Sequence, residues 1–182
     1  MRRLVSLFVL SVLLVPGISS AQGLSEEPIG TLAELMRGIF FPNANKLFDV
    51  QAVEPGGELP EMTPEVSEAV SAVVGSASAR FLSIYRGWPE VAGAAVALAD
   101  GAKLALLEGR SCENGVSAPF DNAEYIEGAR LLEESALNVL NGAREQDYEA
   151  VWDAVNYVNE SCTHCHRTFR DGPDSRQEPR CQ

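Results

Sequence analysis

Residues 162–166 of this 182-residue chain read Cys-Thr-His-Cys-His, and they hold the residue types with the most specific chemistry. Thiols three positions apart can each form a thioether with one vinyl group of a haem, and a histidine directly after the second thiol can coordinate the iron. With four cysteines and two histidines in 182 residues, this pattern arises by chance in roughly one such chain in a thousand. We therefore predict one covalently bound haem c per chain, attached through Cys162 and Cys165 with His166 as an iron ligand.

Two other uses of the same cysteine pair stay open. A redox dithiol of the CxxC type normally lies in a βαβ unit, and no strand-like alternation is present. A zinc site would need a second pair of ligands, and the remaining cysteines are Cys112 and Cys181. In an oxidising compartment these two are expected to form a disulfide, with two free thiols or an intermolecular bond as the alternatives.

The N-terminal 21 residues have the pattern of a secretory signal peptide. Two arginines precede an apolar run over residues 4–18, and small residues at positions 19–21 suit cleavage. The run is short and interrupted for a transmembrane span, which favours the signal-peptide interpretation. The alternative is that the segment is retained as a membrane anchor. Cleavage after Ala21 leaves residues 22–182 as a single domain without a membrane span, which we expect in the bacterial periplasm.

Helical periodicity dominates the part of the chain that must position the motif. Apolar residues recur at i, i+3 and i+4, and no long stretch alternates with a period of two. Helices are expected over residues 28–53, 63–85, 90–108, 122–144 and 147–170. Pro42 is expected to kink or interrupt the first of them. The pattern predicts an all-α chain folded as an antiparallel four-helix bundle. The four principal helices are those over 28–53, 90–108, 122–144 and 147–170. We also expect an extra segment at 54–86, between the first and second of these helices, and an irregular tail at 171–182.

Several other side chains are expected to have structural roles and not to bind the haem or its iron. The aromatic residues expected in the core are Phe40, Phe41, Phe48 and Trp152. Arg37 is expected to form a solvated ion pair, with a contact to a haem propionate as the alternative. His164 is expected to face solvent rather than the iron.

The motif lies at the end of the last expected helix, and Phe169 and Arg170 follow His166 by three and four residues. In this form, CxxCHxx(Y/F)R, it resembles the C-terminal helix of the cytochrome c′ and cytochrome c556 family, the class II c-type cytochromes. The resemblance implies a four-helix bundle around one haem c, and it covers most of residues 22–182 as an order of helices. It also implies that Arg170 contacts a haem propionate, with a helix-end cation as the alternative.

The same resemblance implies how the other face of the iron is covered. In this family the first helix supplies the residue that faces the distal haem surface, and Met36 is the methionine of the first expected helix. A thioether ligand raises the potential of a histidine-ligated haem and leaves no open position for a gas. We therefore expect His166 and Met36 as the axial ligands. Alternatively, Met36 is a core residue, and Leu32 or Leu35 packs over a five-coordinate iron.

These expectations define a one-electron carrier and not an enzyme, since no catalytic triad, carboxylate pair or phosphate-binding loop is evident. The net charge of −12 and the sequence pI near 4.6 argue against nucleic acid as a partner and predict a redox partner protein with a basic patch. The alternatives are a five-coordinate protein that binds NO or CO, and a haem with a structural role in a larger complex. Related bundles often pair through their first two helices, which makes a homodimer one expected state unless the extra segment obstructs it.

Overall fold

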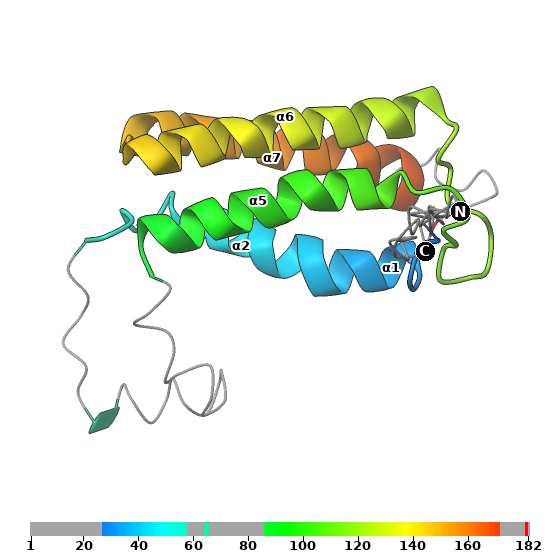
Figure 1. Ribbon diagram of the computed structural model, residues 1–182, viewed down its shortest axis with the longest axis horizontal. Helices are drawn as coiled ribbons and strands as arrows, with labels where there is room; N and C mark the ends of the chain where they lie inside the picture. The colour runs from blue at the N-terminus through cyan, green and yellow to red at the C-terminus, as the bar shows by residue number, and fades with distance from the viewer. Residues whose placement is uncertain (1–26, 58–63, 66–85, 172–180, 182) are drawn as a thin grey trace, which may run out of the picture.

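The computed structural model describes residues 27–57, 64–65, 86–171 and 181, and every regular element among them is helical (Figure 1). The elements are α1 (Leu32–Leu35), η1 (Met36–Phe40), α2 (Phe41–Asp49), α5 (Trp88–Ala105), α6 (Ala123–Glu145), α7 (Tyr148–His166) and η2 (Arg167–Asp171), where η marks a π-helical turn. The all-α prediction is confirmed for these residues. The expected signal peptide and most of the expected helix over 63–85 lie outside the described residues.

Within this part of the chain, α5, α6 and α7 lie side by side, with α6 packed along both of the others (Figure 1). Only Gln146 and Asp147 connect α6 to α7, so these two helices run antiparallel. The first helical stretch, α1–η1–α2, packs on α5, and α2 also contacts α7. The end of α7, which carries the cysteine motif, therefore lies at the same end of the molecule as α1 and the start of α6 (Figure 1).

The first helix is broken where the sequence predicts a break. Pro42 has no N–H and cannot donate an α-helical hydrogen bond. The residues before it form the π-turn η1, in which the Phe41 N–H donates to the Met36 carbonyl five residues back. The Asn43 side chain donates to the Ile39 carbonyl at 2.7 Å and satisfies a carbonyl beside the break. The interruption separates α1 from α2 and puts Met36 at the first position of the π-turn.

Small side chains build much of the core, which lets the helix backbones approach closely. The buried alanines of the long helices include Ala94, Ala95, Ala99, Ala102, Ala105, Ala129, Ala136, Ala143 and Ala154. Larger side chains fill the remaining space, among them Leu47, Leu98 and Val155, each with no exposed surface. The core therefore joins the first helical stretch to all three long helices.

Two of the four aromatic assignments to the core are wrong. Phe40 is buried and Phe48 half-buried, as predicted, but the exposed fraction is 71% for Phe41 and 41% for Trp152. Phe41 follows the π-turn, which has more residues per turn than an α-helix and shifts the buried face onto Phe40. Trp152 is next to the buried Val151, and one residue rotates the helix by about 100°, which moves Trp152 out of the core.

A disulfide joins the α5–α6 connection to the C-terminal tail. Cys112 and Cys181 are bonded, with their Cα atoms 4.7 Å apart, so the expected intramolecular pairing is confirmed. Asp171 belongs to η2 and not to the irregular tail expected at 171–182; apart from Cys181, the rest of that segment lies outside the described residues. Among the helices that the structure describes, none combines the length and the apolar character that a membrane span needs.

The same connection holds the start of the first helix. Arg110 is only 3% exposed, and its guanidinium donates to the carbonyls of Ile29 and Gly30 at 3.3 and 3.0 Å. The Leu32 N–H donates to the Ser111 carbonyl at 2.8 Å. Residues about eighty positions further along the chain therefore hold the segment that leads into α1.

Candidate functional site

The two motif cysteines continue the buried face of α7. Val151, Val155 and Val158 are fully buried along this helix, and Cys162 and Cys165 follow at helical spacing. Both cysteines are half-buried, neither is in a disulfide, and Cys162 packs against the hydrophobic core. The helix therefore presents both thiols at the edge of the core, where they can meet an apolar group.

Burial keeps these thiols protonated. It raises the pKa of Cys162, against a smaller opposing effect of the Ser161 hydroxyl and the nearby Arg170 charge. It raises the pKa of Cys165 to about 11, with Cys162 as a second, smaller cause. A redox dithiol works through a thiolate with a lowered pKa. The environment of this pair therefore disfavours thiol–disulfide exchange at neutral pH.

His166 ends α7 and is half-buried, whereas His164 is exposed, as predicted. The helix continues directly into η2, and the Arg167 N–H donates to the Thr163 carbonyl. The two histidines are separated by about 200° around the helix, so they face different surroundings.

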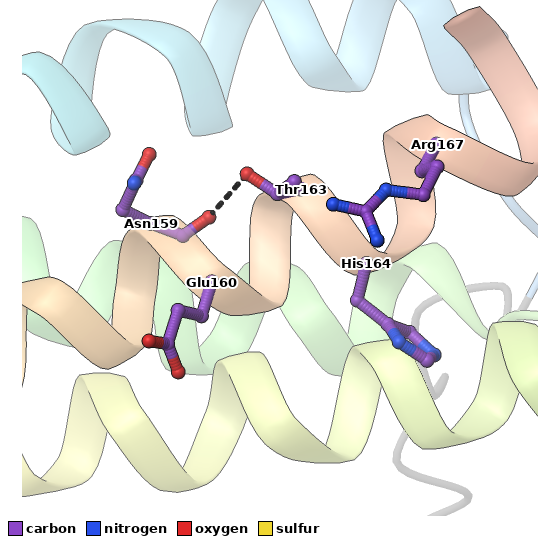
Figure 2. Close-up of a pocket in the computed structure, with 5 residues that line it drawn as sticks. All are labelled: Asn159, Glu160, Thr163, His164 and Arg167. Carbon is purple, nitrogen blue, oxygen red and sulfur yellow. Dashed lines mark hydrogen bonds between the residues drawn. The ribbon is translucent and has the colours of Figure 1, made fainter. Parts of the chain in front are cut away.

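A shallow surface pocket of about 360 Å³ lies along the last two turns of α7. Its lining residues are Asn159, Glu160, Thr163, His164 and Arg167 (Figure 2). In Figure 2, Glu160 and His164 are directed toward α6, while the Thr163 hydroxyl donates to the Asn159 carbonyl at 2.9 Å. Thr163 and His164 of the motif line this pocket, whereas neither motif cysteine nor His166 does.

On the inner side, α6 closes against the second thiol at Gly128. This glycine is buried, and a Cβ built on it would overlap Cys165 Sγ and lie 3.2 Å from His164 Cδ2. Sequence reasoning did not single out Gly128. The available signal was a glycine inside a well-formed helix, where it costs about 0.5–1 kcal/mol relative to alanine unless packing requires it.

Tyr125 is a second residue of this region that the sequence did not reveal. Its hydroxyl donates to the Ala105 carbonyl at 3.2 Å, and its ring meets Phe169 edge to face with centroids 5.5 Å apart. Burial raises the pKa of Tyr125, and the nearby Cys165 thiol adds to this effect, so the phenol stays protonated. The Tyr125–Phe169 contact anchors η2 on α6. Arg170 follows in the same turn with an exposed side chain.

Met36 is half-buried and packs against the same core cluster as Cys162. No Cα atom of α1 or η1 lies within 8 Å of a Cα atom of α7 or η2. Met36 and His166 are therefore not in direct backbone contact.

Arg37, beside Met36, is engaged elsewhere. Its guanidinium donates to both carboxylate oxygens of Glu113 at 2.8 Å, which confirms the expected solvated ion pair. Hydrogen bonding to Glu113 raises the pKa of Arg37, and the same bond lowers the pKa of Glu113. This pair ties the first helical stretch to the α5–α6 connection.

The residues present fit a haem better than a protein-ligated metal ion. Within the described ranges, no cluster of three or more His, Cys, Asp and Glu side chains could hold a metal. A zinc site lacks ligands because Cys112 is in a disulfide. A haem brings four nitrogen ligands of its own, so the chain needs to supply only one or two. Cys162, Cys165 and His166 lie within an arc of about 100° at the core edge, which suits attachment through both thiols and the imidazole.

Comparisons of this chain with protein-family models, curated proteins and solved structures found no match.

Proposed function

We propose that this protein is an exported one-electron carrier with a single haem c, built on an antiparallel four-helix bundle of the cytochrome c′ and cytochrome c556 type. The observation that carries the proposal is the end of α7, where Cys162 and Cys165 are half-buried, unpaired and protonated, with His166 directly beside them. A haem bound there would supply the Fe(III)/Fe(II) couple. The chain would hold it covalently and set its surroundings.

Cys162 and Cys165 would hold the haem edge at the core, and His166 would supply the proximal imidazole. Tyr125 and Phe169 support this role because they fix η2 directly after His166, leaving little freedom for the end of the helix. Arg170 is exposed near the end of η2, four residues after His166. We propose that it would pair with a haem propionate.

Met36 would be the second axial ligand. Its partial burial against the same core cluster as Cys162 supports this assignment. The π-turn supports it further, because such turns are uncommon and occur often at functional sites. A neutral thioether would raise the reduction potential and close the iron to external ligands.

The acidic surface favours a redox partner with a basic patch. The exposed side of α6 carries several carboxylates. Glu127 and Glu134 are paired with Arg130 at 2.8 and 2.7 Å, and Glu124 lies in the first turn of α6. With a net charge of −12, association with such a partner would slow as salt is added.

The first experiment is an absorption spectrum of the purified holoprotein, oxidised and reduced, with and without CO. His/Met ligation gives a low-spin spectrum with a far-red sulfur-to-iron band that CO leaves unchanged. Met36→Ala should abolish this band, and Met62→Ala is the matched control that should retain it. A high-spin spectrum that shifts with CO would contradict Met36 ligation and support the alternative in which the iron binds NO or CO.

A further inference from the structure

Two buried glycines lie on the face of α6 that packs on α7. They are Gly128 and Gly142, whose spacing along the chain is close to four helical turns. A Cβ at Gly142 would lie 2.9 Å from Val151 Cγ2, and a Cβ at Gly128 would overlap Cys165 Sγ. Both positions let the backbone of α6 approach α7 more closely than any side chain would permit.

The two contacts differ in chemistry. At Gly142 the neighbouring atom is a valine methyl group, whose role is packing. At Gly128 it is the sulfur of Cys165, one of the two thiols that attach the haem in the function proposed above. Whatever occupies position 128 therefore decides where this sulfur can lie.

The position of Cys165 Sγ depends on a single torsion, χ1, which has three staggered states. One of the three is rare in helices because it clashes with the preceding turn. A Cβ at position 128 would exclude the state seen in the structure, so the sulfur would have to rotate to another state or α6 would have to move away. Either change displaces the thiol from its place at the core edge.

Thioether formation is sensitive to such a displacement. The Cys165 S–H adds across a haem vinyl group: the sulfur bonds to the inner carbon, the hydrogen goes to the terminal carbon, and the double bond becomes single. No electrons are lost or gained in this addition. It requires the sulfur to reach one particular carbon, because a ring held by Cys162 and His166 would leave the second vinyl group little freedom to move.

We propose that Gly128 is the positioning residue for the second thioether: without a side chain it admits Cys165 Sγ against α6, and a residue with a Cβ there leaves the haem attached through Cys162 alone. This inference rests on the proposed function, and it adds a specific requirement on a helix that carries none of the attachment motif.

The test uses the full-length chain matured as holoprotein, with Gly128→Ala compared to wild type. Proteolysis and mass spectrometry of haem-bearing peptides identify the bonded cysteines, and the haemochrome spectrum in alkaline pyridine reports unreacted vinyl groups through a shift to longer wavelength. We expect two thioethers in wild type and one, at Cys162, in G128A.

G128A combined with Cys162→Ala should lose covalent haem, whereas G128A combined with Cys165→Ala should retain it. Gly93→Ala on α5 is the matched control, because a Cβ there meets nothing within 4 Å.

The outcomes separate the two proposals. Two thioethers in G128A, at the wild-type yield, would overturn the role of Gly128 and leave the proposed function intact. Absence of covalent haem from wild type would overturn the proposed function and this inference with it. If G128A does not fold, G128A with Cys165→Ala should fold, because that change removes the atom with which the new Cβ collides. Failure of this double variant would show that the sulfur is not the obstacle and would contradict the proposal.

Discussion

The α6–α7 pair and the first helical stretch are held in place in different ways. α6 and α7 are continuous helices with side-chain N-caps from Asn122 and Asp147, and Gln146 joins them in the left-handed conformation (φ 57°). The residues that position the motif, including Gly128 and Tyr125, all lie on this pair or on η2, apart from the backbone carbonyl that the Tyr125 hydroxyl contacts.

The first stretch instead depends on residues far away in sequence. It is broken by a π-turn and Pro42, and its start is fixed by Arg110, by the Arg37–Glu113 pair and by a connection closed with the Cys112–Cys181 disulfide. The proposed attachment side is thus set by local structure, and the proposed Met36 side by long-range contacts. Perturbing those contacts should affect Met36 ligation while leaving haem attachment intact.

Removing the disulfide should have the largest effect. The Cys112→Ser/Cys181→Ser variant opens a loop with a sequence separation of 69 residues, which costs about 4 kcal/mol by the loop-entropy estimate. Urea unfolding of the holoprotein measures this loss. The far-red sulfur-to-iron band should weaken, while the two thioethers remain. Equal loss of the band and of the thioethers would show that the two sides are not held independently.

Replacing Arg110 by methionine should have the next largest effect. The change removes the charged donor of the Ile29, Gly30 and Leu104 carbonyls, and hydrogen bonds to a charged group contribute about 1.5–3 kcal/mol to the free energy of unfolding. Denaturant titration of the variant checks this value. Because Ile29 and Gly30 directly precede the N-cap of α1, the Met36 band should weaken here too; a band of wild-type intensity would mean that the start of α1 does not control Met36.

The pH dependence of the apoprotein tests the attachment side. Burial raises the pKa of Cys165 from 9.0 to about 11 in the folded chain, so the folded state favours the protonated thiol. The resulting stabilisation is fully present below pH 9 and should be lost as the pH rises toward 11, by at most about 2 kcal/mol. Unfolding curves between these pH values measure it. Cys165→Ser provides the control and should reduce this dependence, and the remainder comes from Cys162 and Tyr125, whose pKa values burial also raises. An unchanged slope would contradict the burial of the Cys165 thiol.

The smallest effect is expected from Arg37→Ala, since both partners of the Arg37–Glu113 pair are exposed. Hydrogen bonding to Arg37 lowers the pKa of Glu113, so the contribution of the pair is present above pH 4.5 and is lost as the pH falls through the lowered pKa. Stability curves of wild type and variant should therefore converge in acid. A large loss of stability at neutral pH would indicate that this pair does more than link two exposed segments.

Much of the fold could be predicted because its signals are local. The bounds of α6 and α7 follow from caps and periodicity, and the motif is a contiguous run of residues. Phe41 was assigned to the wrong side of the first helix, because periodicity assumes a constant number of residues per turn and the π-turn changes that number. The break at Pro42 was predictable, but the form that it takes was not.

The partners of the motif could not be read from the sequence in the same way. Gly128 and Tyr125 matter because of what lies opposite them, and this depends on the register between α6 and neighbouring helices. That register is set jointly by the short connection at Gln146 and by the packing of small buried residues. Neither feature alone is enough to predict which residues of the two helices are in contact. The Cys112–Cys181 pairing was predictable because only two cysteines remained outside the motif.

The two-residue connection between α6 and α7 has a consequence for the order in which the chain folds. Contacts across such a short connection close a small loop and form early, whereas those of the first stretch reach across most of the chain and must wait for larger loops to close. We therefore expect the helical hairpin that carries Cys162, Cys165 and His166 to be formed before α1 and η1 dock. During that interval the side of α7 that the first stretch later approaches would still be accessible to a large, flat, apolar ligand.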